Sequence, residues 1–302
     1  MKLAAIDIGS NAGRLLISEA SPNSLGEMDF TKINLVRVPL RLGFDVFDTK
    51  RISDKKAEEL VKTIQAYKLL LEVYEVKHLK ACATSAMRDA ENGQEILARV
   101  KAETGIDIHI ITGQEEASFI YENHIAEHLD ITKSYLYIDV GGGSTEITCF
   151  SANRLLFKES FNIGTIRLLH NQVTEEQWQQ LKSFIKNQLR QLLNVVAIGS
   201  GGNINKIFSL SKRKEGKPLS LETLKNYHKE LSSVSQDERI HVYKLREDRA
   251  DVIVPALLIY INIMRWANAE EIFVPKIGLA DGIIHALYNE VTHQPSFDME
   301  KA

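Results

Sequence analysis

Short apolar runs and amphipathic stretches alternate along the whole chain. Residues 3–6 are apolar and end at Asp7 and a polar turn, and residues 14–18, with three apolar residues at their centre, are predicted to form the returning strand. This pattern predicts a hairpin with a polar tip. From 53 to about 76, apolar residues recur at helical spacing behind a serine and an aspartate, which predicts a capped amphipathic helix. Residues 79–83 follow as a predicted buried strand.

Two further helix starts are marked by a small polar residue followed three positions later by a glutamate. Asn92 with Glu95 resembles a capping box, and Gly105 is placed to end that helix. Thr112 with Glu115 forms the same pattern. We therefore expect one helix to begin at each of these positions.

The second half of the chain repeats the order of the first. Residues 135–138 are apolar and end at Asp139 and a glycine turn, and a strand is predicted over 146–150. A predicted helix over about 175–193 leads to the strand 195–198, which ends in a further glycine turn. The alternation predicts mostly parallel sheets covered by helices, with an antiparallel hairpin at the start of each half. The duplication predicts two similar domains that face each other across a ligand site.

Length and composition agree with two folded domains. The chain has 302 residues, of which 44% are hydrophobic and only 6 are proline, which excludes disordered and collagen-like classes. We place the first domain at 1–125 and the second at 126–282, with a linker near 123–133. The last helix, at about 283–302, can pack back on the first domain.

The chain carries no pattern of a membrane or secreted protein. Its longest apolar stretch, 252–264, is interrupted by polar and proline residues and is shorter than the roughly 20 residues of a membrane span. Cys82 and Cys149 are too few for a disulfide scaffold. We therefore expect a cytoplasmic protein without a membrane segment.

The charge balance excludes a general affinity for duplex nucleic acid. Lysine and arginine number 37 against 40 aspartates and glutamates, a formal net charge of -3. Any anion site must therefore be local. The only notable basic run, Lys212 to Lys217, is either a solvated loop or a guide for a polyanion.

Three glycine-rich turns follow apolar strands and are candidate phosphate sites. Glycine lets backbone N–H groups approach a ligand closely, although a hairpin turn needs glycine in any case. The chain contains neither a P-loop motif nor a dinucleotide-binding motif. Arg88 is a candidate phosphate clamp, with a surface pair to Asp89 as the alternative. The predicted phosphate-binding residues are Gly9, Ser10, Asn11, Arg14, Arg88, Gly141, Gly142, Gly143, Ser144, Gly201, Gly202 and Asn203.

Acidic residues near these turns are candidates for metal binding and catalysis. Asp7 and Asp139 each end an apolar strand, where a carboxylate either accepts turn N–H bonds or helps to hold Mg²⁺ beside substrate phosphates. Glu146 follows the second glycine turn. Glu115 occupies the capping position, which leaves Glu116 to accept a proton from an attacking water, unless it is only a solvated first-turn residue.

Seven ordered motifs resemble signatures of the Ppx/GppA family of exopolyphosphatases and guanosine pentaphosphate phosphatases, within the actin-like and sugar-kinase-like superfamily. In chain order they are Asp7-Ile8-Gly9-Ser10-Asn11 with Arg14-Leu15, Ala83-Thr84-Ser85-Ala86-Met87-Arg88-Asp89-Ala90, Thr112-Gly113-Gln114-Glu115-Glu116-Ala117, Asp139-Val140-Gly141-Gly142-Gly143-Ser144-Thr145-Glu146, Ile163-Gly164 with Arg167-Leu168, Gly201-Gly202, and Arg249-Ala250-Asp251-Val252-Ile253. Two single positions, Ala12 and Asn203, and one segment, Leu279-Ala280-Asp281-Gly282, depart from the family pattern.

The resemblance implies an α/β fold of two ribonuclease-H-like domains with an interdomain cleft, in the short form that lacks a C-terminal helical region. It implies that Glu116, Asp139 and Glu146 are catalytic and handle the water and the metal. Asp7, Asp139 and Glu146 are the expected metal ligands, for Mg²⁺ or Mn²⁺. The glycine loops and Arg88 correspond to the family's phosphate binders.

The activity implied first is exopolyphosphatase, releasing orthophosphate from the end of inorganic polyphosphate. Guanosine pentaphosphate phosphohydrolase is the alternative. An ATP-dependent small-molecule kinase and a non-catalytic protein that binds guanosine tetraphosphate are more distant alternatives. A homodimer is compatible with the sequence but not indicated by it.

Overall fold

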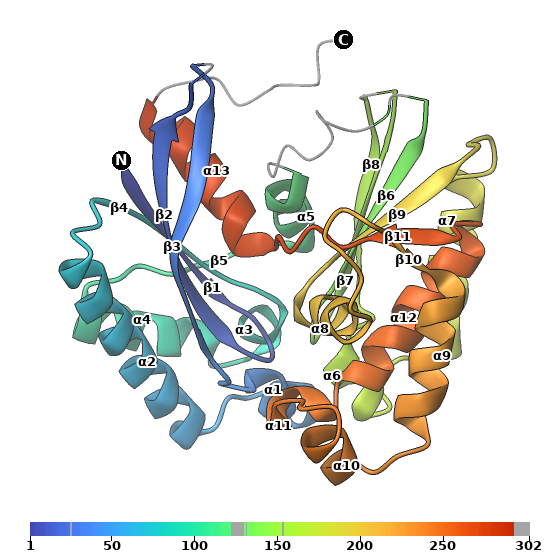
Figure 1. Cartoon of the computed structure of the whole chain (residues 1–302). Coiled ribbons are helices and arrows are strands. Elements are labelled where there is room, and N and C mark those ends of the chain that lie inside the picture. The colour runs from blue at the N-terminus through green and yellow to red at the C-terminus, as the bar shows by residue number, and fades with distance from the viewer. Residues whose placement is uncertain (25, 122–129, 131, 153, 293–302) are drawn as a thin grey trace. The chain divides into compact units, whose positions relative to one another are not determined.

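The computed structural model describes residues 1–24, 26–121, 130, 132–152 and 154–292. The chain divides into two compact units. In Figure 1 the first is coloured from blue to green and also includes the red helix α13, and the second is coloured from green to orange. Unit 1 comprises 1–123 and 279–302, and unit 2 comprises 124–278. The second boundary therefore falls before Leu279 rather than after Gly282, because Leu279 and Ala280 pack in the apolar core of unit 1. The predicted linker lies largely outside the described residues.

Unit 1 is built on a mixed sheet with the strand order β3-β2-β1-β4-β5. Its strands are β1 (Lys2–Ile8), β2 (Gly13–Pro22), β3 (Met28–Val38), β4 (His78–Ala83) and β5 (His109–Ile110). Strands β1, β2 and β3 form an antiparallel meander, whereas β4 and β5 continue the sheet in parallel.

Helices cover both faces of this sheet. They are α1 (Leu42–Thr49), α2 (Asp54–Val73), α3 (Ser85–Asp89), α4 (Gly93–Thr104), α5 (Gly113–Tyr121) and α13 (Leu279–Thr292). Leu3 and Ala5 point to the face that α13 covers, and Figure 1 shows this last helix beside α5. Ile8 points to the other face, where Tyr67 of α2 donates a hydrogen bond to Gly13 O at 3.0 Å.

Unit 2 repeats this plan with the strand order β10-β11-β9-β6-β7-β8. Its strands are β6 (Ser134–Val140), β7 (Thr145–Ser151), β8 (Arg154–Phe161), β9 (Val195–Ser200), β10 (Leu219–Ser220) and β11 (Glu271–Phe273). Its helices are α6 (Thr165–Leu169), α7 (Glu175–Gln188), α8 (Gly202–Leu210), α9 (Leu221–Ser232), α10 (Gln236–His241), α11 (Glu247–Ala250) and α12 (Ile253–Trp266). The apolar helix α12 packs against α7, α8 and α9 in the core of this unit.

The two sheets share a five-strand topology, to which unit 2 adds β10 antiparallel to β11, and this confirms the predicted pair of ribonuclease-H-like α/β domains. An antiparallel meander (β1-β2-β3 or β6-β7-β8) is followed by parallel strands in each unit. The expectation of mostly parallel sheets was wrong. Each predicted hairpin gains a third antiparallel strand, so that both sheets are mixed.

Helix caps agree with the sequence pattern at some positions and not at others. Ser53 caps α2 by accepting a hydrogen bond from Lys56 N, as predicted. The capping box at Asn92 was wrong, because its side-chain amide instead pairs with the N–H and C=O of Ile52, at 3.0 and 2.8 Å. Gly105 ends α4 in the left-handed conformation, as predicted. Among the described helices, none combines the length and the apolar character needed to cross a bilayer.

Candidate functional site

Four adjacent strands of unit 2 place polar residues in one row across the end of the sheet. Asp139 on β6 lies directly opposite Glu146 on β7, and Glu146 lies opposite Ser160 on β8. On its other side Asp139 is level with Ser200, the last residue of β9. Residues in register point to the same face of a sheet, with Cβ atoms about 5 Å apart in an antiparallel pair. The row therefore brings two carboxylates and two hydroxyls together.

The environment of this row favours a bound cation. Glu146 is only 2% exposed, and its Oε1 accepts a hydrogen bond from Ser160 Oγ at 2.8 Å. Asp139 is half-buried beside it. Two neighbouring carboxylates repel each other when both are ionised, and a divalent cation would relieve that repulsion. Ser200 Oγ is buried and has no hydrogen-bond partner within the described part of the chain, so its oxygen is available to coordinate a cation.

The donor set fits a hard cation that shares its coordination with substrate. No group of three or more histidine, cysteine, aspartate or glutamate side chains able to hold a metal occurs among the described residues. Mg²⁺ does not need such a cage, because it commonly binds through one or two carboxylates, water and substrate phosphates. Asp139 and Glu146 match that requirement, and all oxygens of the row are hard ligands.

The glycine turn between β6 and β7 is held from one side by the backbone of α6 and by the side chain of Arg167 in the same helix. Thr165 N donates to Gly141 O at 3.0 Å, Ile166 N donates to Gly142 O at 2.9 Å, and Arg167 Nε donates to Gly143 O at 2.7 Å. The C=O and N–H of a trans peptide point in opposite directions, and every described peptide is trans. The N–H groups of residues 142–144 therefore point away from α6. Successive N–H groups on one side of a turn form an anion-binding nest.

A second candidate anion site lies at the start of α8. Gly201 has φ 105° and ψ 161°, a conformation that favours glycine, and it joins β9 directly to the helix. A Cβ on Gly202 would lie 2.7 Å from Arg249 Nη2, so the Arg249 guanidinium lies against the N-terminus of α8. First-turn N–H groups, the positive end of the helix dipole and a guanidinium together suit a phosphate.

This second site adjoins the carboxylate row. A Cβ on Gly201 would lie 3.0 Å from Asp139 Oδ1 and 3.9 Å from the hydroxyl of Tyr260. Tyr260 on α12 donates a hydrogen bond to Ser200 O, which ties the ends of β6 and β9 to the helix behind them. Burial, and then the charge of Asp139, raise the pKa of Tyr260 well above its ordinary value, so this hydroxyl stays a donor.

In unit 1 the corresponding hairpin carries a cation where unit 2 carries a carboxylate. Asp7 pairs with Arg14 across β1 and β2, as Asp139 pairs with Glu146. Asp7 is 2% exposed, and its Oδ2 lies 2.6 Å from Arg14 Nη1. The hairpin tip is fixed by Gly9 N donating to Ala12 O at 3.1 Å. Asp7 thus faces a guanidinium, and its predicted part in binding metal stays a prediction.

Other predicted residues of unit 1 gather around the ends of β1, β4 and β5. Ser10 Oγ and Ser85 Oγ are 2.8 Å apart, which links the hairpin tip to α3. Arg88 Nη1 donates to Ile111 O at 2.7 Å, so this arginine contacts the chain just after β5, and its predicted role as a phosphate clamp stays a prediction. Asn11 lies at the same tip, where its O accepts a hydrogen bond from Arg41 N at 2.9 Å.

The two adjacent glutamates of α5 differ as predicted in their local contacts. Glu115 Oε2 accepts from Thr112 N at 2.7 Å and from Thr112 Oγ1 at 2.8 Å, and Glu115 N donates to Thr112 Oγ1 at 3.2 Å. The backbone N–H and then the hydroxyl of Thr112 lower the pKa of Glu115. Glu116 is 7% exposed, so it is not a solvated first-turn residue.

A Cβ on Gly282 would lie 1.6 Å from Phe119 O, which shows how closely α13 and α5 approach.

Sequence patterns did not indicate every residue that shapes the site. Ser160, Ser200 and Tyr260 were missed because their role depends on strand register and helix packing, which a single sequence does not reveal. Arg249 was noted only as part of a motif. The signal for Arg249 was its place in an ordered set of motifs, since its contact with Gly202 spans distant parts of the chain.

Three known proteins resemble the chain over most of its length. It is 29% identical over 295 residues to a bifunctional 3-dehydroquinate synthase/phosphatase of Fusobacterium nucleatum, covering 90% of this chain and 44% of that protein. It is 24% identical over 311 residues to exopolyphosphatase 1 of Mycobacterium tuberculosis, covering 94% and 87% respectively. A crystal structure of the Aquifex aeolicus Ppx/GppA family member matches with a TM-score of 0.74 at 25% identity, covering 98% of this chain and 99% of that one.

The chain therefore spans less than half of the bifunctional relative and most of the other two. The match to the Ppx/GppA phosphatase family extends over residues 23–290. It includes α5 with its two glutamates, the Asp139 hairpin and the start of α8. With the fold, the ordered motifs and this match in agreement, the chain belongs to the Ppx/GppA phosphatase family.

Proposed function

We propose that the protein is an exopolyphosphatase, a divalent-cation-dependent hydrolase that removes the terminal phosphate of inorganic polyphosphate. The observation that carries the proposal is the carboxylate pair of Asp139 and Glu146 beside two backbone anion sites. Membership of a phosphatase family and the likeness to an exopolyphosphatase support this reading.

The residues of unit 2 would bind and orient the terminal phosphate. The N–H groups of residues 142–144 and of the first turn of α8 would donate to its oxygens, with Arg249 adding a charge-assisted donor. Asp139 and Glu146 would hold Mg²⁺ or Mn²⁺. When bound, the cation neutralises charge on the phosphate oxygens and so favours attack by water.

Glu116 is the proposed general base. In the reaction, the oxygen of a water molecule forms a bond to the terminal phosphorus while the bridging P–O bond breaks. The water proton passes to the Glu116 carboxylate, and the shortened chain leaves with the electron pair of the broken bond. Little covalent work is asked of the protein, so positioning and charge neutralisation supply most of the rate enhancement.

Release of orthophosphate tests the proposal directly. The purified protein is compared on medium-chain polyphosphate, guanosine pentaphosphate and ATP, each with Mg²⁺ and with EDTA. We expect release from polyphosphate that EDTA abolishes and that Glu146→Gln reduces strongly. Glu159→Gln is the matched control, because Glu159 is opposite Ile147 in the same strand pair and points to the other face of the sheet.

Two results would contradict the proposal. Release that is faster from guanosine pentaphosphate than from polyphosphate would make the nucleotide the substrate. Phosphoryl transfer from ATP to an acceptor, without hydrolysis of polyphosphate, would make the protein a kinase.

A further inference from the structure

A concentrated positive patch lies in unit 2 outside the residues of the proposed reaction. All residues from 212 to 217 are exposed, and four of these six are basic. A fifth cation, Lys276, reaches the same place, because its Nζ lies 3.3 Å from Glu215 Oε1. The basic loop is defined here by Lys212, Arg213, Lys214, Glu215, Lys217 and Lys276. These residues carry a net charge of +4 on a chain whose formal net charge is -3.

The topology of the sheet places the basic loop at the same end of the strands as the candidate phosphate sites. β10 runs antiparallel to β11, whereas β11, β9 and β6 run parallel. The basic loop leads into the start of β10, and Lys276 follows the end of β11. Both therefore lie at the end of the sheet where β6 and β9 also finish. β10 is two strands from β9 and three from β6. At about 4.8 Å per strand, the loop begins on the order of 10–15 Å from the phosphate sites.

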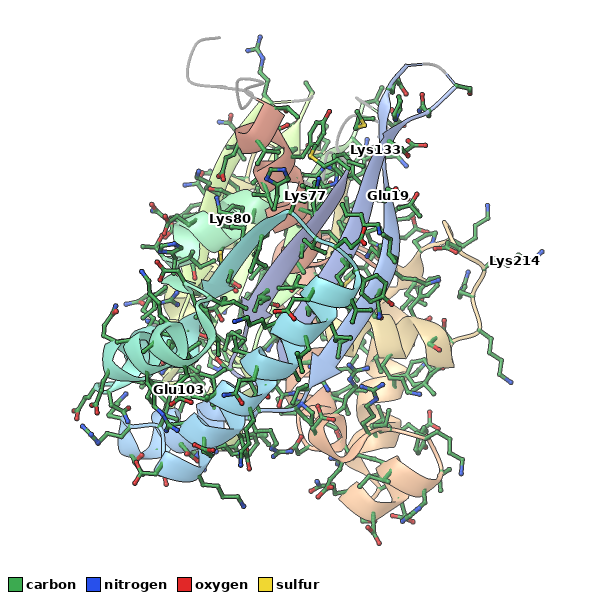
Figure 2. All side chains as sticks on the ribbon, turned by 90° about the vertical axis from the view of Figure 1, so that its left-hand side faces the viewer. Glu19, Lys77, Lys80, Glu103, Lys133 and Lys214 are labelled. Atoms are coloured by element: carbon green, nitrogen blue, oxygen red, sulfur yellow. The ribbon has the colours of Figure 1, made fainter. Side chains whose placement is uncertain are left out.

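The loop has a defined backbone, and its basic residues are exposed. Lys217 N donates to Lys214 O at 3.1 Å in a turn, and Gly216 has φ 76°. At the end of α8, Arg213 N donates to Ser211 Oγ at 3.3 Å, and Ser211 Oγ donates to Phe208 O at 2.7 Å. Figure 2 shows Lys214 standing clear of the body of unit 2 on this loop. The ion pair with Glu215 is exposed and weak, so it leaves most of the positive field available.

We propose that the basic loop binds the phosphates that follow the terminal one in a long polyphosphate chain. This inference rests on the proposed function, because the chain end must be held at the strand ends for the rest of it to reach the loop. Flexible ammonium and guanidinium groups around an open surface suit a polyanion of variable conformation, which they attract from a distance and hold without fixed geometry.

The chemistry of the loop favours inorganic polyphosphate over a nucleotide. A guanine base binds best where an aromatic side chain or a guanidinium plane stacks on it and polar groups read its edge. Residues 211–218 include no aromatic side chain, and their only guanidinium is the exposed Arg213. Repeating phosphates need only cations, which this surface supplies in excess.

The test neutralises the cations of the basic loop and leaves the residues of the candidate phosphate sites unchanged. One variant carries Lys212→Gln, Arg213→Gln, Lys214→Gln and Lys217→Gln. The control variant carries Lys186→Gln, Arg190→Gln, Lys225→Gln and Lys229→Gln, which remove the same charge from other exposed positions of unit 2. The kcat/KM of each is measured with tripolyphosphate, which is too short to occupy both places at once, and with polyphosphate of more than a hundred units. Fluorescence anisotropy of labelled long polyphosphate, in EDTA, measures binding without turnover.

We expect the loop variant to lose about tenfold or more in kcat/KM and in affinity for long polyphosphate, at low salt. Its kcat/KM for tripolyphosphate should change less than about twofold, and added salt should reduce the difference between wild type and variant. The control variant should behave as the wild type on both substrates.

Equal losses on both substrates, or no loss on either, would overturn the role of the loop. The proposed function would still stand if the wild type hydrolyses polyphosphate. If the wild type hydrolyses no polyphosphate, the proposed function fails. In that case the anisotropy measurement alone tests whether the basic loop binds long polyphosphate. If the loop variant binds long polyphosphate as tightly as the wild type, the loop does not have the proposed role.

Discussion

At the scale of single residues, the clearest division of labour is between Glu115 and Glu116. Glu115 is hydrogen-bonded to Thr112 at the start of α5, whereas the buried Glu116 is the proposed base. We predict that Glu116→Gln lowers kcat by roughly 100-fold to 10,000-fold, with KM nearly unchanged, because general-base catalysis contributes about that much. Steady-state kinetics at saturating Mg²⁺ measures both constants.

Glu115→Gln is the matched control for this variant. A glutamine keeps a capping-box partner for Thr112, so turnover should stay close to that of the wild type. A crippled Glu115→Gln enzyme beside a normal Glu116→Gln enzyme would show that the assignment of cap and base is reversed.

At the scale of elements, α6 determines the shape of the glycine turn after β6. A Cβ on Gly164 would lie 2.3 Å from Gly142 O and 2.5 Å from Gly142 C. We predict that Gly164→Ala displaces the turn, raises KM several-fold and destabilises the protein by about 1–3 kcal/mol, the usual cost of overpacking. Denaturant unfolding and substrate titration measure the two effects.

The nearby Asn162→Ala serves as the control, because Asn162 is exposed two residues before Gly164. It should change neither stability nor KM by much. A Gly164→Ala protein with unchanged KM would mean that α6 does not fix the turn for substrate.

Elements with a strong local signal could be predicted from the sequence, and those defined by distant partners could not. The long helix behind Ser53 and the start of α5 at Thr112 depend on neighbouring residues, and both were found. β3 and β8 were missed because both are edge strands with many exposed residues and little apolar contrast. Asn92 failed as a cap because the backbone of Ile52, forty residues away, supplies its partners.

The same distinction applies to the site. Asp139 and the glycine turns lie at strand ends that the apolar pattern reveals. The hydrogen bond from Ser160 to Glu146 and the contact of Arg249 with Gly202 depend on register and packing. That the two domains face each other across a ligand site stays a prediction.

At the scale of the whole molecule, each unit has its own core and one buried thiol. Cys82 lies in unit 1 and Cys149 in unit 2, and burial raises the pKa of each thiol to about 12. We predict that neither reacts rapidly with a thiol reagent at pH 8 until its own unit opens, because the thiolate is the reactive form. Labelling at increasing denaturant, followed by peptide mass analysis, reports the opening of each unit separately. Rapid labelling of either cysteine without denaturant would show that its core is open in the native protein.

The two units also differ in the charge that each hairpin presents. Unit 1 pairs Asp7 with Arg14, whereas unit 2 pairs Asp139 with Glu146. One duplicated topology thus carries a neutralised carboxylate in one copy and an acidic pair in the other. In the proposed reaction, the acidic pair of unit 2 binds the divalent cation.

The most direct test of this claim is the Mg²⁺ dependence of orthophosphate release from tripolyphosphate by the wild type, Asp139→Asn and Glu159→Gln. We expect Asp139→Asn to need at least about tenfold more Mg²⁺ for half-maximal rate, because loss of a charged ligand weakens a site of so few carboxylates. Glu159→Gln should follow the wild-type curve. An Asp139→Asn enzyme with the wild-type Mg²⁺ curve and undiminished activity would show that Asp139 does not bind the cation.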